Sequence, residues 1–152
     1  KLKNKHNLNI FIDYAHTPDA LKNLLKGLKR NCKGKLLSII GCGGDRDKKK
    51  RPLMTKEALT YSDAVIITDD NPRDENPSKI RNDMKKNLRE IDKKNIKEIA
   101  DREKAIQYSI KLLNKNDFLV ITGKGHENYQ IYKDRKSFFS DKDTVLKFIG
   151  KL

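Results

Sequence analysis

The sequence TDDNPRDENP, residues 68–77, joins a strand to a helix. The apolar run AVII comes directly before it, and its length and β-branched content predict a buried strand. Asn76 and Pro77 at its end are typical of a helix N-cap and a first helical position. In between, Asn71 precedes a proline and is therefore favoured in an extended conformation. We interpret residues 70–73 as a ligand site at the end of a strand.

The same alternation of strand and helix continues through the chain in both directions. Strands are predicted at residues 8–12, 35–40, 64–68, 96–100 and 118–121, and a hairpin at 129–139 with Asp134 and Arg135 in its turn. Helices are predicted after the caps Thr17, Asn76, Asp101 and Ser140, and at residues 52–61; the helix after Asn76 is expected to reach about residue 89. This order predicts an α/β fold: a Rossmann-like three-layer domain with a mostly parallel sheet of about six strands and helices on both faces.

Unusual polar clusters follow four of the predicted strands, at residues 13–18, 41–47, 69–76 and 122–127. Because parallel sheets bind ligands at the carboxyl ends of their strands, we expect these clusters to meet in one site. Their charges fit a zwitterion. Glu127 would receive an ammonium group, and Arg46 and Arg73 would receive carboxylates.

The segment at residues 41–51 is rich in glycine and then basic, so its amides, lysines and Arg51 are able to cradle a phosphate. It lacks the spacing of a P-loop, and Arg46 stands where a dinucleotide fingerprint has its third glycine. A tight turn would explain the glycines but not Asp45 and Asp47. We expect these aspartates to hold Arg46 in one orientation.

The remaining clusters give weaker indications. Asp13 and His16 are able to receive a ribose hydroxyl and a base edge, whereas Phe11 and Tyr14 are expected in the core. His126 is either a local hydrogen-bonding residue or part of the site. The sequence shows no nucleophile with a recognisable base, no metal-ligand cluster and no triphosphate loop. It therefore predicts a domain that binds and positions a ligand without catalysing by itself.

Composition limits the classes of protein. The 152 residues are enough for one domain with a real core, and Lys and Arg exceed Asp and Glu by 35 to 21, giving +14. We assign this excess to a general bias toward lysine, because no basic-aromatic stripe suits nucleic acid. Cys32 and Cys42 have no metal spacing and are predicted to be reduced. Without a membrane-length apolar segment or a signal peptide, a cytoplasmic location is expected, and the start at Lys1 suggests a piece of a longer protein.

Four motifs together resemble the C-terminal domain of Mur ligases, from about residue 8 to the end. They are DYAHTPD at residues 13–19, GCGGDRDK at 41–48, DNPR at 70–73 and GKGHE at 123–127, in the order of that family. The likeness is strongest to the members that add the third residue of the peptidoglycan stem peptide. It implies that residues 1–152 are one amino-acid-binding domain, and that an N-terminal domain for the UDP-linked substrate and a central ATPase domain lie outside this chain.

The resemblance also implies a ligand set. The residues expected to contact meso-diaminopimelate are Arg46, Asp70, Asn71, Pro72, Arg73, Gly123 and Glu127. Asp13 and His16 would face the nucleotide. ATP and Mg²⁺ would be held mainly by the central domain and UDP-MurNAc-dipeptide by the other domains, with no metal ligand or catalytic residue here. Neither nucleic acid nor membrane is an expected partner. A buried arginine would reject lysine, which lacks the second carboxylate.

Three alternatives remain at this point. A related ligase would accept lysine or another amino acid, and a solvent-facing Arg73 would favour it. A nucleic-acid-binding module would account for the +14 charge. A small-molecule-binding domain would act without any ligase partner.

Overall fold

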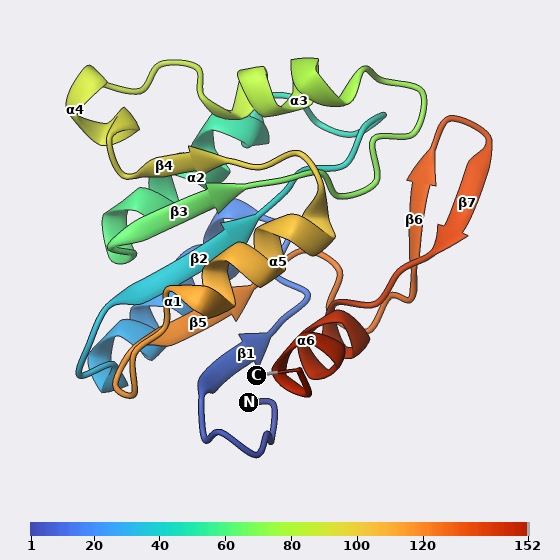
Figure 1. Ribbon diagram of the computed structural model, residues 1–152. Helices are drawn as coiled ribbons and strands as arrows, with labels where there is room; N and C mark the ends of the chain where they lie inside the picture. Colours follow the sequence, from blue (N-terminus) through green and yellow to red (C-terminus); the bar gives the residue numbers. More distant parts are fainter. Residues whose placement is uncertain (152) are drawn as a thin grey trace.

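The computed structural model describes residues 1–151, and its centre is a five-stranded, wholly parallel sheet (Figure 1). In spatial order the strands are β1 (Asn9–Ile12), β5 (Phe118–Ile121), β2 (Leu36–Ile40), β3 (Ala64–Ile67) and β4 (Ile96–Glu98). The expectation of about six strands is corrected to five. Strands β6 (Tyr129–Tyr132) and β7 (Arg135–Phe138) form a separate antiparallel hairpin because they pair only with each other and through one bridge to Arg73.

The middle of the sheet is buried on both faces, as its continuous apolar runs predict. All five residues of β2 are buried, and Ile39 is paired in register with Ile66 of β3 and Ile121 of β5. The next residue of the chain after each of these strands is polar or glycine. The apolar runs therefore set where the polar loops begin.

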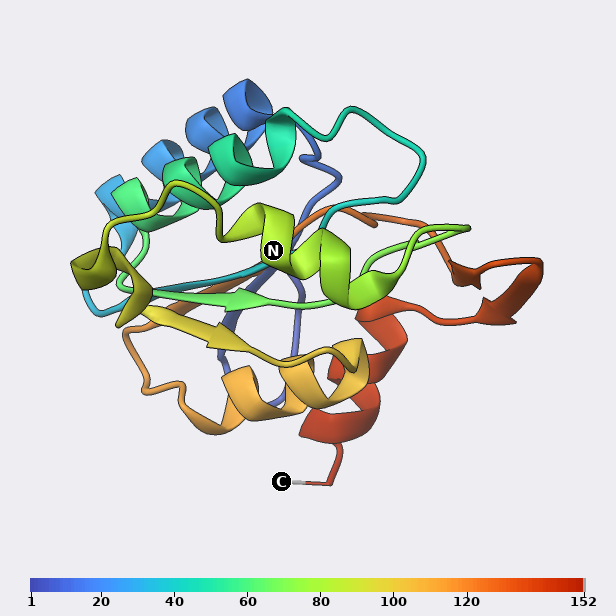
Figure 2. The same cartoon turned by 90° about the horizontal axis from the view of Figure 1, so that it is seen from above.

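Helices cover both faces of the sheet, which makes three layers (Figure 2). On one face lie α1 (Pro18–Asn31), α2 (Lys50–Tyr61) and α3 (Pro77–Met84), and on the other lie α5 (Arg102–Lys111) and α6 (Asp141–Ile149). The first core contains Leu21, Met54 and Ile80 against β2 and β3, and the second contains Ile106 and Val145. A short helix, α4 (Glu90–Lys93), leads into β4. None of the helices within residues 1–151 is long and apolar enough to cross a membrane.

All four predicted side-chain caps are confirmed. Thr17, Asn76, Asp101 and Ser140 each accept a hydrogen bond from a backbone amide in the first turn of the helix that follows. These caps depend only on neighbouring residues, so the local sequence is sufficient to place them.

Several predicted boundaries are wrong. The helix expected at residues 52–61 begins at Lys50, and the strand expected at 96–100 ends at Glu98. Two further errors have a clear cause in the backbone. The helix that begins at Pro77 ends at Met84 instead of about residue 89, and Asn87 has a φ of 59°, a left-handed conformation that cannot continue a helix. The hairpin turn consists of Lys133 and Asp134, with Lys133 at a φ of 52°, and Arg135 already belongs to β7. Both boundaries were predicted from the spacing of apolar residues, and this spacing carries no information about the left-handed conformations of Asn87 and Lys133.

Candidate functional site

The carboxyl ends of β1, β2, β3 and β5 surround a pocket of about 450 Å³. Of the residues that the sequence nominates, seven line it: His16, Arg46, Asp70, Asn71, Arg73, Gly123 and Glu127. Asp13 and Pro72 do not. The lining also includes residues that the sequence did not nominate for a site, among them Tyr14, Cys42 and Tyr129. Four loops far apart in the sequence therefore meet, as the parallel arrangement predicts.

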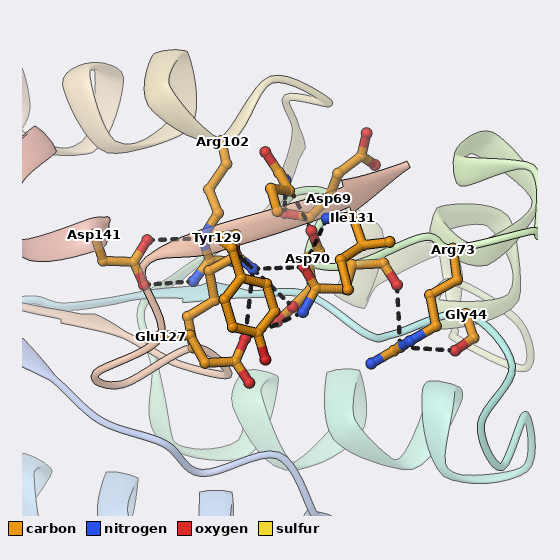
Figure 3. A network of polar contacts seen from close by, with 12 residues as sticks. Gly44, Asp69, Asp70, Arg73, Arg102, Glu127, Tyr129, Ile131 and Asp141 are labelled. Atoms are coloured by element: carbon orange, nitrogen blue, oxygen red, sulfur yellow. Dashed lines mark hydrogen bonds and ion pairs between the residues drawn. The ribbon is translucent and has the colours of Figure 1, made fainter. Parts of the chain in front are cut away.

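The loops that carry Arg46 and Arg73 are pressed together, backbone against backbone. The amide of Gly44 donates to the carbonyl oxygen of Asn71 (2.9 Å), and Nη1 of Arg73 donates to the carbonyl oxygen of Gly44 (2.9 Å; Figure 3). A Cβ atom on Gly44 would collide with the carbonyl oxygen of Pro72. Buried Pro72 thus shapes the crossing of the loops rather than lining the pocket.

Arg73 has an unusual backbone and a partly engaged side chain. Its φ of 52° is left-handed, and its half-buried guanidinium donates to carbonyl oxygens of Gly44 and Asn71 (2.9 and 3.3 Å). Both acceptors bond to Nη1, so the other guanidinium nitrogens have no protein partner within residues 1–151. The outer edge of the fork is available to a ligand in the pocket.

Arg46 lies exposed at the pocket rim, and its predicted fixation by Asp45 and Asp47 is wrong. Oδ2 of Asp45 accepts from the amide of Asp74 (3.3 Å), and Oδ1 of Asp47 accepts from the amide of Lys49 (2.9 Å). Nη1 of Arg46 donates instead to the carbonyl oxygen of Asp45 (3.0 Å). The aspartates shape the loop, because short carboxylates next to backbone amides bond to them first.

The acidic side of the pocket is organised by Lys124, a fully buried residue that sequence reasoning missed. Its Nζ donates to Oδ1 of Asn71 and to the carbonyl oxygen of Tyr129, both at 2.8 Å. Oδ1 of Asp70 lies 3.4 Å away and Oε2 of Glu127 3.7 Å away. Burial lowers the pKa of Lys124, while the two carboxylates oppose that shift. Two carboxylates around one buried cation leave one net negative charge facing the pocket.

Asn71 is bonded within the protein on both sides of its amide. Oδ1 accepts from Lys124 and from the amide of Ile131 (3.1 Å), and Nδ2 donates to Oε2 of Glu127 (3.1 Å). Asn71 therefore ties the loop after β3 to the loop after β5 and to the hairpin. A lysine between two glycines, three residues beyond the end of β5, was the signal in the sequence that could have identified Lys124 as the partner of Asn71.

The loop after β5 depends on Gly123. Its φ is +104°, and a Cβ atom there would collide with Oδ2 of Asp70, so only glycine lets that carboxylate lie against the backbone. Behind the loop, Arg102 pairs with both oxygens of Asp141 (2.8 Å each) and donates to the carbonyl oxygen of Thr122 (2.9 Å; Figure 3). This fully buried ion pair joins α5, α6 and the end of β5.

At the side of the pocket formed by the loop after β1, the aromatic rings differ from expectation. Tyr14 is 46% exposed rather than in the core, with its ring centroid 4.7 Å from that of His16 and 5.8 Å from that of His126. Phe11 does pack inward against Phe118. Asp13 uses Oδ1 to accept from the amide of Ala15 (2.9 Å), so it stabilises the turn before α1.

The expected phosphate cradle is contradicted at Arg51. Its side chain is fully buried beneath the loop and paired with Glu75 and Asp83, so it cannot reach a ligand. Lys50 remains in the lining and donates to the carbonyl oxygen of His16 (2.8 Å). Within residues 1–151, no group of three or more His, Cys, Asp or Glu side chains is placed to hold a metal ion. Burial raises the pKa of the Cys42 thiol to about 12, and both cysteines are free.

The family model for the glutamate ligase domain of Mur ligases matches residues 1–125. The chain belongs to the Mur ligase family. Among relatives of this Mur ligase domain, the UDP-N-acetylmuramoyl-L-alanyl-D-glutamate--2,6-diaminopimelate ligases of Prochlorococcus marinus and Clostridioides difficile are 50% and 47% identical over 92% and 98% of the chain. The chain spans 27% and 31% of their lengths.

Solved structures agree with this assignment of the Mur ligase domain. One UDP-N-acetylmuramoyl-L-alanyl-D-glutamate--2,6-diaminopimelate ligase aligns with a TM-score of 0.88 and 44% identity, over 93% of this chain and 29% of that one. A murein peptide ligase from Psychrobacter arcticus aligns with a TM-score of 0.66 at 16% identity, over 96% of this chain and 29% of that one, which shows a shared fold.

Proposed function

We propose that this domain binds the incoming amino acid in a longer, ATP-dependent ligase that adds meso-diaminopimelate to UDP-MurNAc-L-Ala-D-Glu during cytoplasmic peptidoglycan synthesis. The observation that carries the proposal is the division of charge across the pocket. Arg46 and Arg73 both lie beside Gly43, and Asp70 and Glu127 both lie beside Lys124. The names of the relatives, which specify diaminopimelate, support the same ligand.

In the proposed complex, Arg73 and Arg46 bind the carboxylate at the far end of diaminopimelate. Glu127 and the backbone at Gly123 receive its amino group. Asp70, Asn71 and Pro72 contribute by fixing the loop that presents Arg73, since Asn71 is bonded internally and Pro72 lies at the loop crossing. Lysine would leave Arg73 partly desolvated and without an anion, which disfavours it strongly.

ATP and Mg²⁺ fit this chain only in part. The segment at residues 41–51 has no P-loop spacing, its Arg51 is paired, and the described residues contain no metal-ligand cluster. We therefore propose that both are held mainly by another domain, as is UDP-MurNAc-dipeptide. Exposed His16 would face the adenine, with Asp13 holding the turn beside the ribose. ATP would supply activation of the acceptor's D-glutamate carboxylate, and this chain's residues orient the amino acid.

Calorimetric titration of the chain with meso-diaminopimelate and with L-lysine tests this function. We expect binding of the first ligand and at least tenfold weaker binding of the second, roughly the discrimination that a carboxylate clamp provides. Should the isolated chain bind neither, the same two amino acids are compared as substrates of the longer ligase. A preference for lysine would overturn the assignment of the ligand.

Arg73→Ala provides the residue-level test. We expect it to weaken meso-diaminopimelate binding by about tenfold or more while changing lysine binding little, because only the first ligand presents a carboxylate there. Arg135→Ala is the matched control, since Arg135 is an exposed arginine at the start of β7 and does not line the pocket. Equal losses for both ligands would refute Arg73 as the discriminating residue.

A further inference from the structure

Arg51, in the first turn of α2, is a fully buried arginine below the two loops that carry Arg46 and Arg73. Its Nη1 donates to Oε2 of Glu75 (3.0 Å) and to Oδ2 of Asp83 (2.9 Å). Its Nη2 donates to Oε1 of Glu75 (2.8 Å) and to the carbonyl oxygen of Gly43 (3.3 Å). One guanidinium thus holds the loop after β2, the loop after β3 and helix α3.

Glu75 connects Arg51 to the loop at the rim of the pocket that carries Arg46. While both of its oxygens accept from Arg51, Oε1 also accepts from the backbone amide of Asp45 (2.8 Å). Asp45 is the neighbour of Arg46 in the sequence, and Glu75 lies two residues after Arg73. The Arg51–Glu75 pair therefore joins the backbones next to the two proposed carboxylate ligands.

The glycine contacts above the pair show how closely the loops fit. A Cβ atom on Gly43 would lie 2.8 Å from Nη1 of Arg73, and one on Gly44 would collide with Pro72. The backbones of the two loops are also bonded directly, since the amide of Gly44 donates to the carbonyl oxygen of Asn71. Beneath this contact, the bonds from Gly43 and Asp45 converge on the Arg51–Glu75 pair.

We propose that Arg51 is a positioning residue that fixes the distance between Arg46 and Arg73 and thereby sets the selectivity of the pocket for an amino acid with a second carboxylate. This inference rests on the proposed function and deepens it. Arg51 does not touch the ligand. It acts through Glu75 and the backbone of residues 43–45.

The geometry requires an arginine at this position. Its planar fork spans both oxygens of Glu75 and still reaches Asp83 and Gly43, whereas a lysine ammonium at one point cannot bridge all three partners. Arg51→Lys retains the positive charge but loses the fork. It therefore separates the positioning role from a simple need for charge neutralisation.

The experiment compares Arg51→Lys with Asp117→Asn. Asp117 is a buried control residue at the amino ends of the strands, away from the pocket. Asp117 accepts from the amides of Lys35 (2.7 Å) and Asn114 (2.9 Å), where the strands begin rather than end. Both variants lose buried hydrogen bonds, but only the first affects the arginine loops. Two readouts are used: amide hydrogen exchange in this chain, and steady-state kinetics with meso-diaminopimelate and L-lysine in the longer ligase.

For Arg51→Lys we expect faster exchange at the amides of Gly44 and Asp45 and unchanged exchange at Lys35 and Asn114. The KM for meso-diaminopimelate should rise about 10- to 100-fold with little change in kcat, as expected for a ligand group displaced by about an ångström. The preference over lysine should fall by the same factor. Asp117→Asn should show the reverse exchange pattern and retain the preference.

The outcomes separate the two levels of inference. A wild-type enzyme that does not prefer meso-diaminopimelate overturns the proposed function. A wild-type enzyme that does prefer it, together with an Arg51→Lys variant of equal preference, overturns only the positioning role. An equal loss of preference in Asp117→Asn would also overturn that role, because the effect would then follow from general destabilisation.

Discussion

Gly44 shows at the scale of one residue how the pocket is built. Its φ is not left-handed, so the position needs glycine for space rather than for backbone conformation. A methyl group there would collide with the carbonyl oxygen of Pro72 and approach Cβ of Glu75 to 3.3 Å. The crossing of the two arginine loops depends on this missing side chain.

Gly44→Ala should therefore lower the free energy of unfolding by about 1 to 3 kcal/mol, the usual cost of overpacking a rigid site. It should also weaken meso-diaminopimelate binding. Gly27→Ala is the control, because Gly27 is exposed in the middle of α1 and its Cβ would meet nothing within 4 Å. That variant should gain about 0.5 to 1 kcal/mol from helix propensity. Urea unfolding measures both changes, and a change in the free energy of unfolding with the same sign in both variants would contradict the steric role of Gly44.

At the scale of elements, the β6–β7 hairpin stabilises the loop after β3 through hydrogen bonds. The amide of Arg73 donates to the carbonyl oxygen of Ile131 (3.1 Å), and the amide of Lys133 donates to that of Arg73 (2.7 Å). The hydroxyl of Tyr132 donates to Oδ2 of Asp69 (3.0 Å). The two backbone bonds hold the left-handed backbone of Arg73, and the Tyr132 bond ties the hairpin to the start of the same loop.

Tyr132→Phe should cost about 1.5 to 3 kcal/mol, because it removes one hydrogen bond to a buried carboxylate. Exchange at the amide of Lys133 should become faster as the hairpin loosens. Tyr108→Phe should change neither quantity, since the Tyr108 hydroxyl has no hydrogen bond to any residue in the range 1–151. Urea unfolding and amide exchange measure the two effects. If Tyr132→Phe changes neither the free energy of unfolding nor the exchange at Lys133, the hairpin does not stabilise the loop after β3.

At the scale of the whole molecule, buried ion pairs couple stability to pH. Arg51 lowers the pKa of Glu75 from 4.5 to about 2, and Lys86 and Arg51 lower the pKa of Asp83. A carboxyl whose pKa is lower in the folded state stabilises the fold above its unfolded pKa. Burial raises the pKa of Asp69, so the ionised form of this carboxyl lowers the stability of the fold instead of increasing it.

The free energy of unfolding should therefore decrease as the pH falls from about 4.5 toward 2. The Glu75→Gln variant should be less stable than the wild type at neutral pH. Over the same pH range its free energy of unfolding should fall by about 1 to 3 kcal/mol less than that of the wild type. Unfolding by urea at a series of pH values measures the slope. A variant with the unchanged slope of the wild type would show that Glu75 does not contribute to acid sensitivity.

Across these scales, local features were predictable and distant pairings were not. Continuous apolar runs placed the strands, and Asn76 and Ser140 placed helix starts, because each depends on a few neighbouring residues. In the sequence, Lys124 was not singled out as a site residue, and Arg51 was expected to reach a phosphate. Their burial depends on Asn71 and Glu75, which lie 53 and 24 residues away. Tyr14, which was expected in the core, lies exposed beside His126, which comes from another loop.

The close contact between the loops at Gly43 and Gly44 also limits how the pocket is able to diversify. A new loop length or an inserted residue on either side would break the crossing, since the backbone of Gly44 lies directly against that of Asn71 and Pro72. Substitution of an outward side chain, such as Arg46, leaves the crossing intact. Redesign for another amino acid should therefore succeed by exchanging side chains on an unchanged backbone, and loop grafting at this site should fail.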